Sequence, residues 1–300
     1  MTKLIGVYAA LLTPRTGSGD LDVERFHRQF DMPASQDLSG YAVNGATGEF
    51  TYVSREELKR ELELTQHLAS GKQVLVGIGA DNVEGAILRG AIAADYGASA
   101  VLLPMPGFFP YRQDDLKSFV LTVSSAVSLP VVLYNLPQFT TGLEPETVLD
   151  ILREDENVIG IKDSSGSLDI VRAITAARLP VARIIGNDGA LRRALEEGVC
   201  DGVVSGVACA LPELMTRIFF SAPGGGAFHR DCQLLDEFIE KLGPLPTPWG
   251  LKVVSDVRGF TQASYPFPLS QQREAQVESL RAWSATWIEQ TLMTEVAEAV

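Results

Sequence analysis

The sequence predicts an α/β fold of the (β/α)8 barrel class, followed by a C-terminal helical extension. Short apolar runs rich in β-branched residues alternate with longer segments of helical periodicity, a pattern typical of parallel βα units. The alternation repeats eight times before residue 223 and then gives way to helical segments alone. Eight units close most economically into a TIM barrel, because closure leaves no unpaired strand edge. We therefore expect a barrel over residues 1–222 and a helical domain over residues 223–300.

The candidate strands are apolar runs of four or five residues, a length typical of buried parallel strands. They are Leu4–Tyr8, Tyr41–Asn44, Val74–Ile78, Ala100–Leu103, Val131–Tyr134, Val158–Lys162, Ala182–Gly186 and Gly202–Ser205.

Segments of helical length separate these runs, and several begin with a capping signal. Ser54 stands three residues before Glu57, the spacing of a capping box in which the two residues satisfy each other's backbone amides. The expected barrel helices are Asp22–Phe30, Ser54–Ala69, Asn82–Tyr96, Asp114–Val127, Pro145–Arg153, Leu168–Ala177, Gly189–Glu197 and Leu211–Phe220, and the expected tail helices are 227–242, 248–257 and 271–290.

A doubly wound open sheet is the alternative architecture. That fold places a glycine-rich phosphate loop after its first strand, and the segment Leu12-Thr13-Pro14-Arg15 is not of that kind. The barrel is therefore preferred.

Charge and composition limit the partners. A formal net charge of −13 disfavours general nucleic-acid or anionic-membrane binding, because either requires a basic surface. The N-terminus lacks the apolar stretch of a signal peptide, and the other apolar runs fall short of the roughly 18 residues of a membrane span. We expect a cytoplasmic protein with a small-molecule substrate.

Cysteine and histidine offer little for metal or triad chemistry. Cys200, Cys209 and Cys232 are odd in number and lack CxxC spacing, which suits reduced thiols. The three histidines are scattered over segments of helical pattern. We expect no metal site, and catalysis without histidine.

The candidate active site is expected where strands end, because barrel enzymes carry their chemistry at the C-terminal ends of the strands. Lys162 closes the sixth apolar run, and burial there disfavours the charged ammonium in favour of the amine that attacks a carbonyl. Tyr134 closes the fifth run, where a phenol can transfer protons. Taken alone, Lys162 also fits a lysine that forms an ion pair, for example with Asp163. Taken alone, Tyr134 also fits a tyrosine of the barrel core.

The loop after the second run, Gly45-Ala46-Thr47-Gly48-Glu49, combines flexible glycines, backbone amides and a hydroxyl. Such a loop binds a carboxylate without arginine, although an ordinary βα turn is the simpler interpretation.

Together these segments resemble the superfamily of dihydrodipicolinate synthase and N-acetylneuraminate lyase, which are pyruvate-dependent class I aldolases. The resemblance spans nearly the whole chain. The motifs that carry it are Gly45-Ala46-Thr47-Gly48-Glu49, Tyr134-Asn135-Leu136-Pro137, Ile159-Gly160-Ile161-Lys162-Asp163-Ser164-Ser165-Gly166, Gly186-Asn187-Asp188 and Gly202-Val203-Val204-Ser205.

The resemblance implies roles for individual residues. Lys162 would form the Schiff base, Tyr134 would transfer protons, Thr47 would bind the pyruvate carboxylate, and the Val204 carbonyl would face the keto acid. It also implies a covalent lysine adduct in place of any cofactor or metal, and a homotetramer built from tight dimers. The substrate-binding set is Gly45, Ala46, Thr47, Gly48, Val204, Phe108, Phe139 and Ser164.

Three departures from the synthase pattern concern the second reactant. Ala46 stands where synthases carry the first of two threonines, and Phe108 stands where a tyrosine reaches the neighbouring subunit's site, unless Tyr111 takes that place. Gln138 or Phe139 occupies the position of the arginine that binds the carboxylate of aspartate semialdehyde, so bidentate recognition is lost.

The polar residues that remain near the expected site suit a polyhydroxylated substrate, and the Lys-Asp-Ser-Ser-Gly run is similar to members acting on 2-keto-3-deoxy sugar acids. These polar residues are Gln138, Thr140, Thr141, Asp163, Ser164 and Ser165. We therefore expect a Schiff-base lyase that cleaves or forms a carbon–carbon bond or dehydrates such a substrate. The alternatives are dihydrodipicolinate synthase and a non-catalytic keto-acid-binding homologue.

Overall fold

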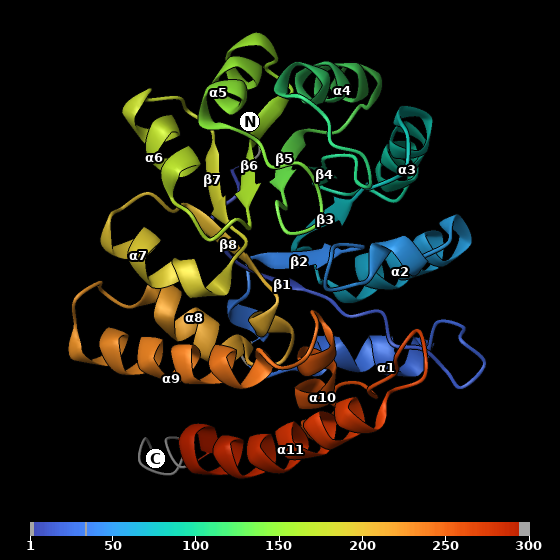
Figure 1. Ribbon diagram of the computed structural model, residues 1–300, viewed down its shortest axis with the longest axis vertical. Coiled ribbons are helices and arrows are strands. Elements are labelled where there is room, and N and C mark those ends of the chain that lie inside the picture. The colour runs from blue at the N-terminus through green and yellow to red at the C-terminus, as the bar shows by residue number, and fades with distance from the viewer. Residues whose placement is uncertain (1–2, 34, 294–300) are drawn as a thin grey trace.

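The computed structural model describes residues 3–33 and 35–293, and within them eight parallel strands close into a barrel in the order β1 to β8 (Figure 1). Each strand pairs with its sequence neighbours, and β1 pairs with β8 to complete the ring. The predicted (β/α)8 barrel is confirmed. The strands are β1 (Gly6–Ala10), β2 (Gly40–Val43), β3 (Gln73–Gly77), β4 (Ala100–Pro104), β5 (Val131–Asn135), β6 (Val158–Asp163), β7 (Ala182–Ile185) and β8 (Gly202–Ser205).

Helices follow the strands and surround the barrel. The predicted capping box is present at the start of α2, where the Glu57 amide donates to Ser54 Oγ at 3.1 Å and the Ser54 amide donates to Glu57 Oε2 at 2.9 Å. The barrel helices are α1 (Val23–Arg28), α2 (Arg55–Leu68), α3 (Val83–Asp95), α4 (Gln113–Ala126), α5 (Pro145–Glu154), α6 (Asp169–Ala176), α7 (Leu191–Glu196) and α8 (Pro212–Phe220).

The C-terminal extension consists of α9 (Gly226–Leu242), α10 (Trp249–Val257) and α11 (Gln271–Ile288), which gather on one side of the barrel (Figure 1). The proposed division at residues 222 and 223 falls in the loop between α8 and α9. Residues 294–300 of the proposed helical domain lie outside the described residues.

Some element boundaries differ from the sequence prediction. Strand β1 begins at Gly6 and extends to Ala10, because Ala9 and Ala10 pair with Tyr41 and Ala42 of β2. Alanine has little intrinsic preference for a strand, so the sequence pattern did not predict that these two residues belong to the strand. The segment predicted as a helix from Gly189 begins instead with a 3-10 turn, Asp188–Ala190, before α7.

Side chains alternate along each strand between two apolar layers. In β5, Val132 and Tyr134 belong to a cluster contributed almost entirely by strands, whereas Val131 and Leu133 pack with the helices. The first cluster is the inner barrel core, which comprises Leu4, Tyr8, Ala10, Ala42, Leu75, Ala100, Leu102, Val132, Tyr134, Leu136, Ile184 and Val204. The alternation therefore decides which strand residues face the barrel interior.

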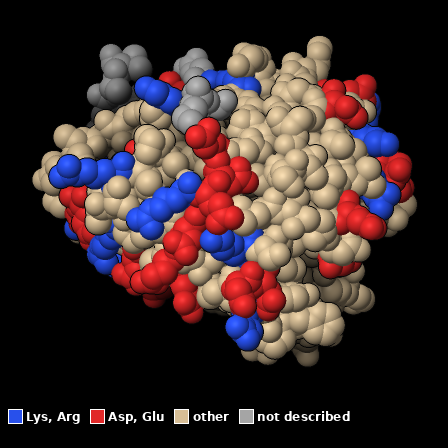
Figure 2. Space-filling model, turned by 90° about the horizontal axis from the view of Figure 1, so that it is seen from above, with Lys and Arg blue, Asp and Glu red and all other residues tan. Residues whose placement is uncertain are grey.

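The surface carries many acidic side chains. On the face shown in Figure 2, Asp and Glu side chains form a stripe with Lys and Arg interspersed, in keeping with the net charge of −13. A broad basic area of the kind that binds phosphates is not seen on this face. None of the helices in the described residues combines the length and apolar character needed to cross a membrane.

Candidate active site

Lys162 and Tyr134 lie side by side inside the barrel, at the C-terminal ends of β6 and β5. The parallel register pairs these two residues, so alternation turns both side chains toward the interior. The Lys162 Nζ atom lies 3.9 Å from the centroid of the Tyr134 ring, and both side chains are buried. The two residues singled out as catalytic are therefore in direct contact.

Asp163 does not pair with Lys162. Its Oδ1 atom accepts hydrogen bonds from Asn135 Nδ2 at 2.9 Å and from the Ser165 amide at 3.0 Å. Burial raises the pKa of the Asp163 carboxyl, and these hydrogen bonds oppose that rise. The predicted pairing with Asp163 is therefore wrong, and the carboxyl group that interacts electrostatically with Lys162 across the cavity is that of Asp188.

Gly186, directly after β7, leaves the space that the Lys162 side chain occupies. A Cβ atom at this position would lie 2.2 Å from Ser164 Oγ and 2.8 Å from Lys162 Cε. The backbone conformation does not require glycine, since Gly186 is not among the residues of positive φ. In the sequence, Gly186 stood out only as part of the motif Gly186-Asn187-Asp188, and its steric role became visible only in the structure.

The loop after β2 brings Thr47 to the same interior. Asn44 and Glu49 bracket this loop in the left-handed conformation, with φ values of 56° and 53°. The Asn44 side-chain amide donates to the Gly77 carbonyl at 2.6 Å, which fastens the loop to β3. A Cβ atom at Gly206, after β8, would lie 3.4 Å from Thr47 Oγ1, so the loop after β8 packs closely against Thr47.

A cavity of about 360 Å³, termed here the inner cavity, collects most of the predicted site residues. Gly45 and Gly48 do not line it. Gly48 instead faces the backbone of Leu11, whose carbonyl oxygen would lie 3.3 Å from a Cβ at that glycine. The predicted residues that line the inner cavity are Ala46, Thr47, Tyr134, Phe139, Lys162, Ser164 and Val204.

The C-terminal extension forms one wall of the inner cavity, a contribution that the helical pattern of this region did not predict. The proline-rich segment 243–248 supplies much of this wall. Residues of the extension that line the cavity are Ile239, Leu242, Gly243, Leu245, Pro246, Thr247, Pro248, Gly250 and Leu251.

A buried ion pair connects this wall to the Thr47 loop. Lys252 Nζ of α10 lies 2.5 Å from Glu49 Oε2 and also donates to the Ser264 carbonyl at 2.7 Å. Burial lowers the pKa of Lys252, and the Glu49 carboxylate opposes that effect. The pair thus holds the loop that carries Thr47 against the extension.

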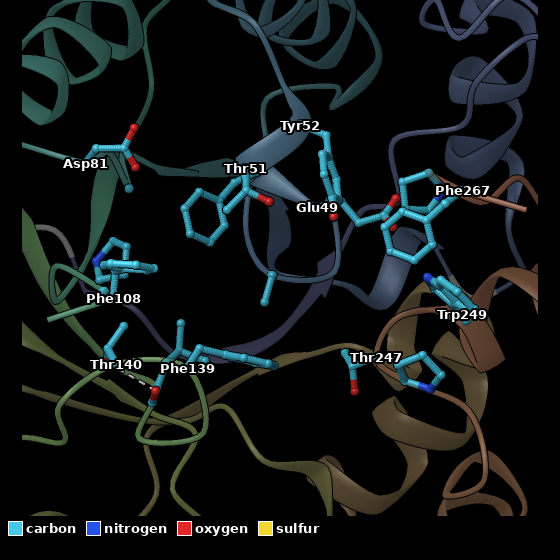
Figure 3. Close-up of a pocket in the computed structure, with 18 of the residues that line it drawn as sticks. Glu49, Thr51, Tyr52, Asp81, Phe108, Phe139, Thr140, Thr247, Trp249 and Phe267 are labelled. Carbon is cyan, nitrogen blue, oxygen red and sulfur yellow. Dashed lines mark hydrogen bonds between the residues drawn. The ribbon is translucent and has the colours of Figure 1, made fainter.

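A second and larger cavity, of about 1100 Å³, adjoins the inner cavity and is ringed by aromatic side chains (Figure 3). We call it the aromatic vestibule. Its aromatic residues are Phe50, Tyr52, Phe108, Phe109, Tyr111, Phe139, Trp249 and Phe267. Phe108 lines only this outer space, where it is 95% exposed; the sequence prediction places its side chain in the neighbouring subunit's site, which lies outside this chain.

Within the described residues, no group of three or more His, Cys, Asp or Glu side chains is arranged to hold a metal ion. The three cysteines are free thiols, and burial raises the pKa of Cys200 and Cys209 to about 12.

Comparison with known proteins places these features in a family. Residues 3–283 match the model of the dihydrodipicolinate synthetase family. The 4-hydroxy-tetrahydrodipicolinate synthase of Bartonella bacilliformis is 30% identical over 278 residues, which cover 89% of this chain and 92% of the relative.

Solved structures agree in fold. The 4-hydroxy-tetrahydrodipicolinate synthase of Methylacidiphilum fumariolicum SolV superimposes with a TM-score of 0.86 at 24% identity, covering 96% of this chain and 98% of that one. N-acetylneuraminate lyase of Mycoplasma synoviae superimposes with a TM-score of 0.82 at 20% identity, again covering 96% and 98%. At these identities the likeness concerns the fold.

Proposed function

The chain belongs to the dihydrodipicolinate synthetase family, and on that premise we propose that Lys162 forms a Schiff base with pyruvate or a 2-keto-3-deoxy sugar acid. The predicted resemblance is confirmed, and so is the broad class, a lyase of the aldolase type. The observation that carries the proposal is the buried Lys162 amine, 3.9 Å from the Tyr134 ring centroid at the inner cavity.

The chemistry follows from this pair of side chains. The Lys162 amine adds to the keto carbon, C2, and loss of water leaves an iminium. When the C3–C4 bond of a sugar acid breaks, its electron pair forms the C2–C3 double bond of an enamine, and the C4 hydroxyl loses its proton to become an aldehyde. The Tyr134 hydroxyl transfers protons during these steps. Thr47, 7% exposed at the cavity wall, supplies a hydroxyl and a backbone amide to the substrate carboxylate.

Two candidate activities differ in the step that follows formation of the Schiff base. Ser164 Oγ is buried at the inner cavity without a hydrogen-bond partner in the described residues, and it favours a hydroxylated substrate. A synthase acting on aspartate semialdehyde is the alternative, favoured by the names of the relatives. Phe139 at the cavity wall argues against the synthase, because an aromatic ring cannot bind a carboxylate bidentately.

We also propose a cytoplasmic homotetramer. Phe108 and Phe109 are 95% and 60% exposed and stack edge to face, which is unusual for a surface that stays in water. Light scattering of the purified protein tests this assembly directly.

Borohydride trapping tests the Schiff base. Incubation with pyruvate and borohydride, followed by peptide mass mapping, should add a reduced pyruvyl group to Lys162. Lys162→Ala should abolish the label, whereas Lys59→Ala, which removes an exposed lysine of α2, should retain it. Labelling elsewhere but not at Lys162 would sink the proposal.

A substrate panel then separates the candidates. Pyruvate release should be measured from 2-keto-3-deoxy sugar acids and sialic acid, and condensation should be measured with pyruvate and aspartate semialdehyde. Labelling of Lys162 without turnover on any substrate would favour the non-catalytic keto-acid binder.

A further inference from the structure

A buried carboxyl group next to the Thr47 loop takes no part in the proposed chemistry, and it belongs to Glu61 of α2. We infer that Glu61 is a positioning residue: its uncharged carboxylic acid holds Thr13 against the Thr47 loop, and ionisation of Glu61 weakens binding of the keto-acid carboxylate. The inference rests on the proposed function, since it takes Thr47 as the carboxylate site. It adds a control of affinity to a site whose chemistry is carried by Lys162 and Tyr134.

Glu61 is joined to the loop through Thr13, which follows β1. Thr13 Oγ1 donates to Glu61 Oε1 at 2.7 Å, and both side chains are buried. A Cβ atom at Gly48 would lie 3.4 Å from Thr13 Oγ1. Gly48 directly follows Thr47, which lines the inner cavity, so Thr13 packs against the backbone that carries the carboxylate site. A movement of Thr13 is therefore transmitted to Thr47.

The Glu61 carboxyl group has no ion-pair partner in the described part of the chain, and its second oxygen, Oε2, is buried without a hydrogen bond there. The guanidinium of Arg15 is engaged elsewhere. It lies 2.6 Å from Glu57 Oε1 and donates to the carbonyls of Gly19 at 2.8 Å and Tyr52 at 3.0 Å. Because a buried charge without a partner is costly, the carboxyl group of Glu61 stays protonated instead.

The charges around Glu61 partly offset one another. Arg15 favours the ionised carboxylate, whereas Glu57, one turn earlier on α2, disfavours it. Among the described residues, the side chains that the neighbouring helices α1 and α3 bury are uncharged. Lys252 of α10, which also experiences the charge of Arg15, is paired with Glu49. Burial therefore dominates, and it raises the pKa of Glu61 from its ordinary value of 4.5 to about 8.

Ionisation of Glu61 opposes keto-acid binding in two ways. The new charge has the same sign as the substrate carboxylate, and repulsion between partly buried charges is weakly screened. The charge also requires hydration or a cation, which the packed surroundings supply only when Thr13 and the loop move. Both effects act on binding of the carboxylate, which is the same before and during the reaction, so they raise KM and leave kcat unchanged.

The pH dependence of pyruvate affinity tests the inference. Exchange of pyruvate methyl protons into deuterated water is measured by NMR between pH 6 and pH 9.5 in the wild type and in Glu61→Gln. Glutamine keeps the shape of the protonated acid but does not ionise. The KM of the wild type divided by that of Glu61→Gln should therefore rise from about one at pH 6 to about fivefold or more above pH 8, while the ratio of the kcat values stays near one. Titration of Lys162 cancels in both ratios.

Two further variants identify the titrating group. Glu63→Gln is the matched control, because Glu63 lies on the same helix but is exposed and pairs with Arg60. It should keep the wild-type profile. Thr13→Val removes a hydrogen bond that favours the ionised carboxylate of Glu61, so the pH at which KM increases should shift upward. This second variant retains Glu61 and does not depend on the folding of Glu61→Gln.

The outcomes separate the inference from the proposed function. Trapping at Lys162 together with parallel KM profiles in the wild type and Glu61→Gln would overturn the inference and leave the proposed function intact. An unshifted midpoint in Thr13→Val, or a wild-type KM that stays constant above pH 8, would overturn it in the same way. Absence of both trapping and proton exchange would remove the proposed function, and the inference with it.

Discussion

The space at Gly186 makes a sharp prediction, because one added methyl group should displace the Lys162 side chain. In Gly186→Ala the new Cβ would lie 2.8 Å from Lys162 Cε and 2.2 Å from Ser164 Oγ. Carbon atoms in contact normally lie about 3.5 to 4.0 Å apart, so Cε must retreat by about 0.7 Å or more. We expect the lysine amine to leave its position over the Tyr134 ring.

The expected effect is large on activity and moderate on stability. A displacement of about 1 Å at a reacting group can lower a rate about 100-fold, and overpacking of a core typically costs about 1 to 3 kcal/mol. The rate of borohydride trapping with pyruvate should therefore fall about 100-fold, with a decrease of several degrees in Tm. Mass mapping gives the trapping rate, and thermal unfolding followed by circular dichroism gives Tm.

A matched variant separates this effect from a general loss of glycine. Gly17 has open space around its Cβ position and does not adopt positive φ, so Gly17→Ala should trap pyruvate at the wild-type rate. A folded Gly186→Ala protein that traps pyruvate as fast as the wild type would refute the steric argument.

Three further predictions concern the proton carrier, the buried ion pair and a buried acid. Tyr134→Phe keeps the ring beside Lys162 but removes the hydroxyl, so exchange of pyruvate methyl protons into deuterated water, followed by NMR, should slow by about 10² to 10⁴; an undiminished rate would exclude Tyr134 as the proton carrier. Lys252→Met leaves the Glu49 carboxylate buried without its partner and should lower the free energy of unfolding by about 3 to 5 kcal/mol in a urea titration. Lys117→Met, which breaks a more exposed pair, should cost less than about 1 kcal/mol, and equal losses would contradict the argument. Burial raises the pKa of Glu61 to about 8, above its ordinary value of 4.5, so the native state retains a proton that the unfolded state releases. Its contribution to stability is complete below pH 4.5 and is lost as the pH rises toward 8, so the wild type should lose stability relative to Glu61→Gln by up to about 1.4 kcal/mol per pH unit in that window; parallel pH profiles would contradict the assignment.

Much of the site was predictable because it depends on local periodicity. Lys162 and Tyr134 each close an apolar run, and in a parallel barrel such positions meet at one end. Their contact across β5 and β6 follows from the side-chain alternation of two paired strands. The Asp163 ion pair is excluded by the same alternation, which turns adjacent residues to opposite faces.

Other features depend on contacts that local patterns do not encode. Tyr134 lies at the end of β5, whereas Phe108 lies in the loop that follows β4. Phe108 itself adopts a φ of 71°, and its side chain is exposed in the aromatic vestibule. Gly186 has an ordinary backbone conformation, so only the position of the neighbouring Lys162 side chain shows that a methyl group has no room.

The sequence by itself determined the eight βα units, the helical tail and the strand-end lysine and tyrosine, because each is written in a repeat of two or 3.6 residues. Only the tertiary structure decided that the tail closes the site. Glu49 and Lys252 are 203 residues apart in the chain, and the pair forms because the closed barrel and α10 bring both into one buried volume. The same packing joins Phe139 to Trp249 and Phe267, and so creates the aromatic vestibule beside Lys162.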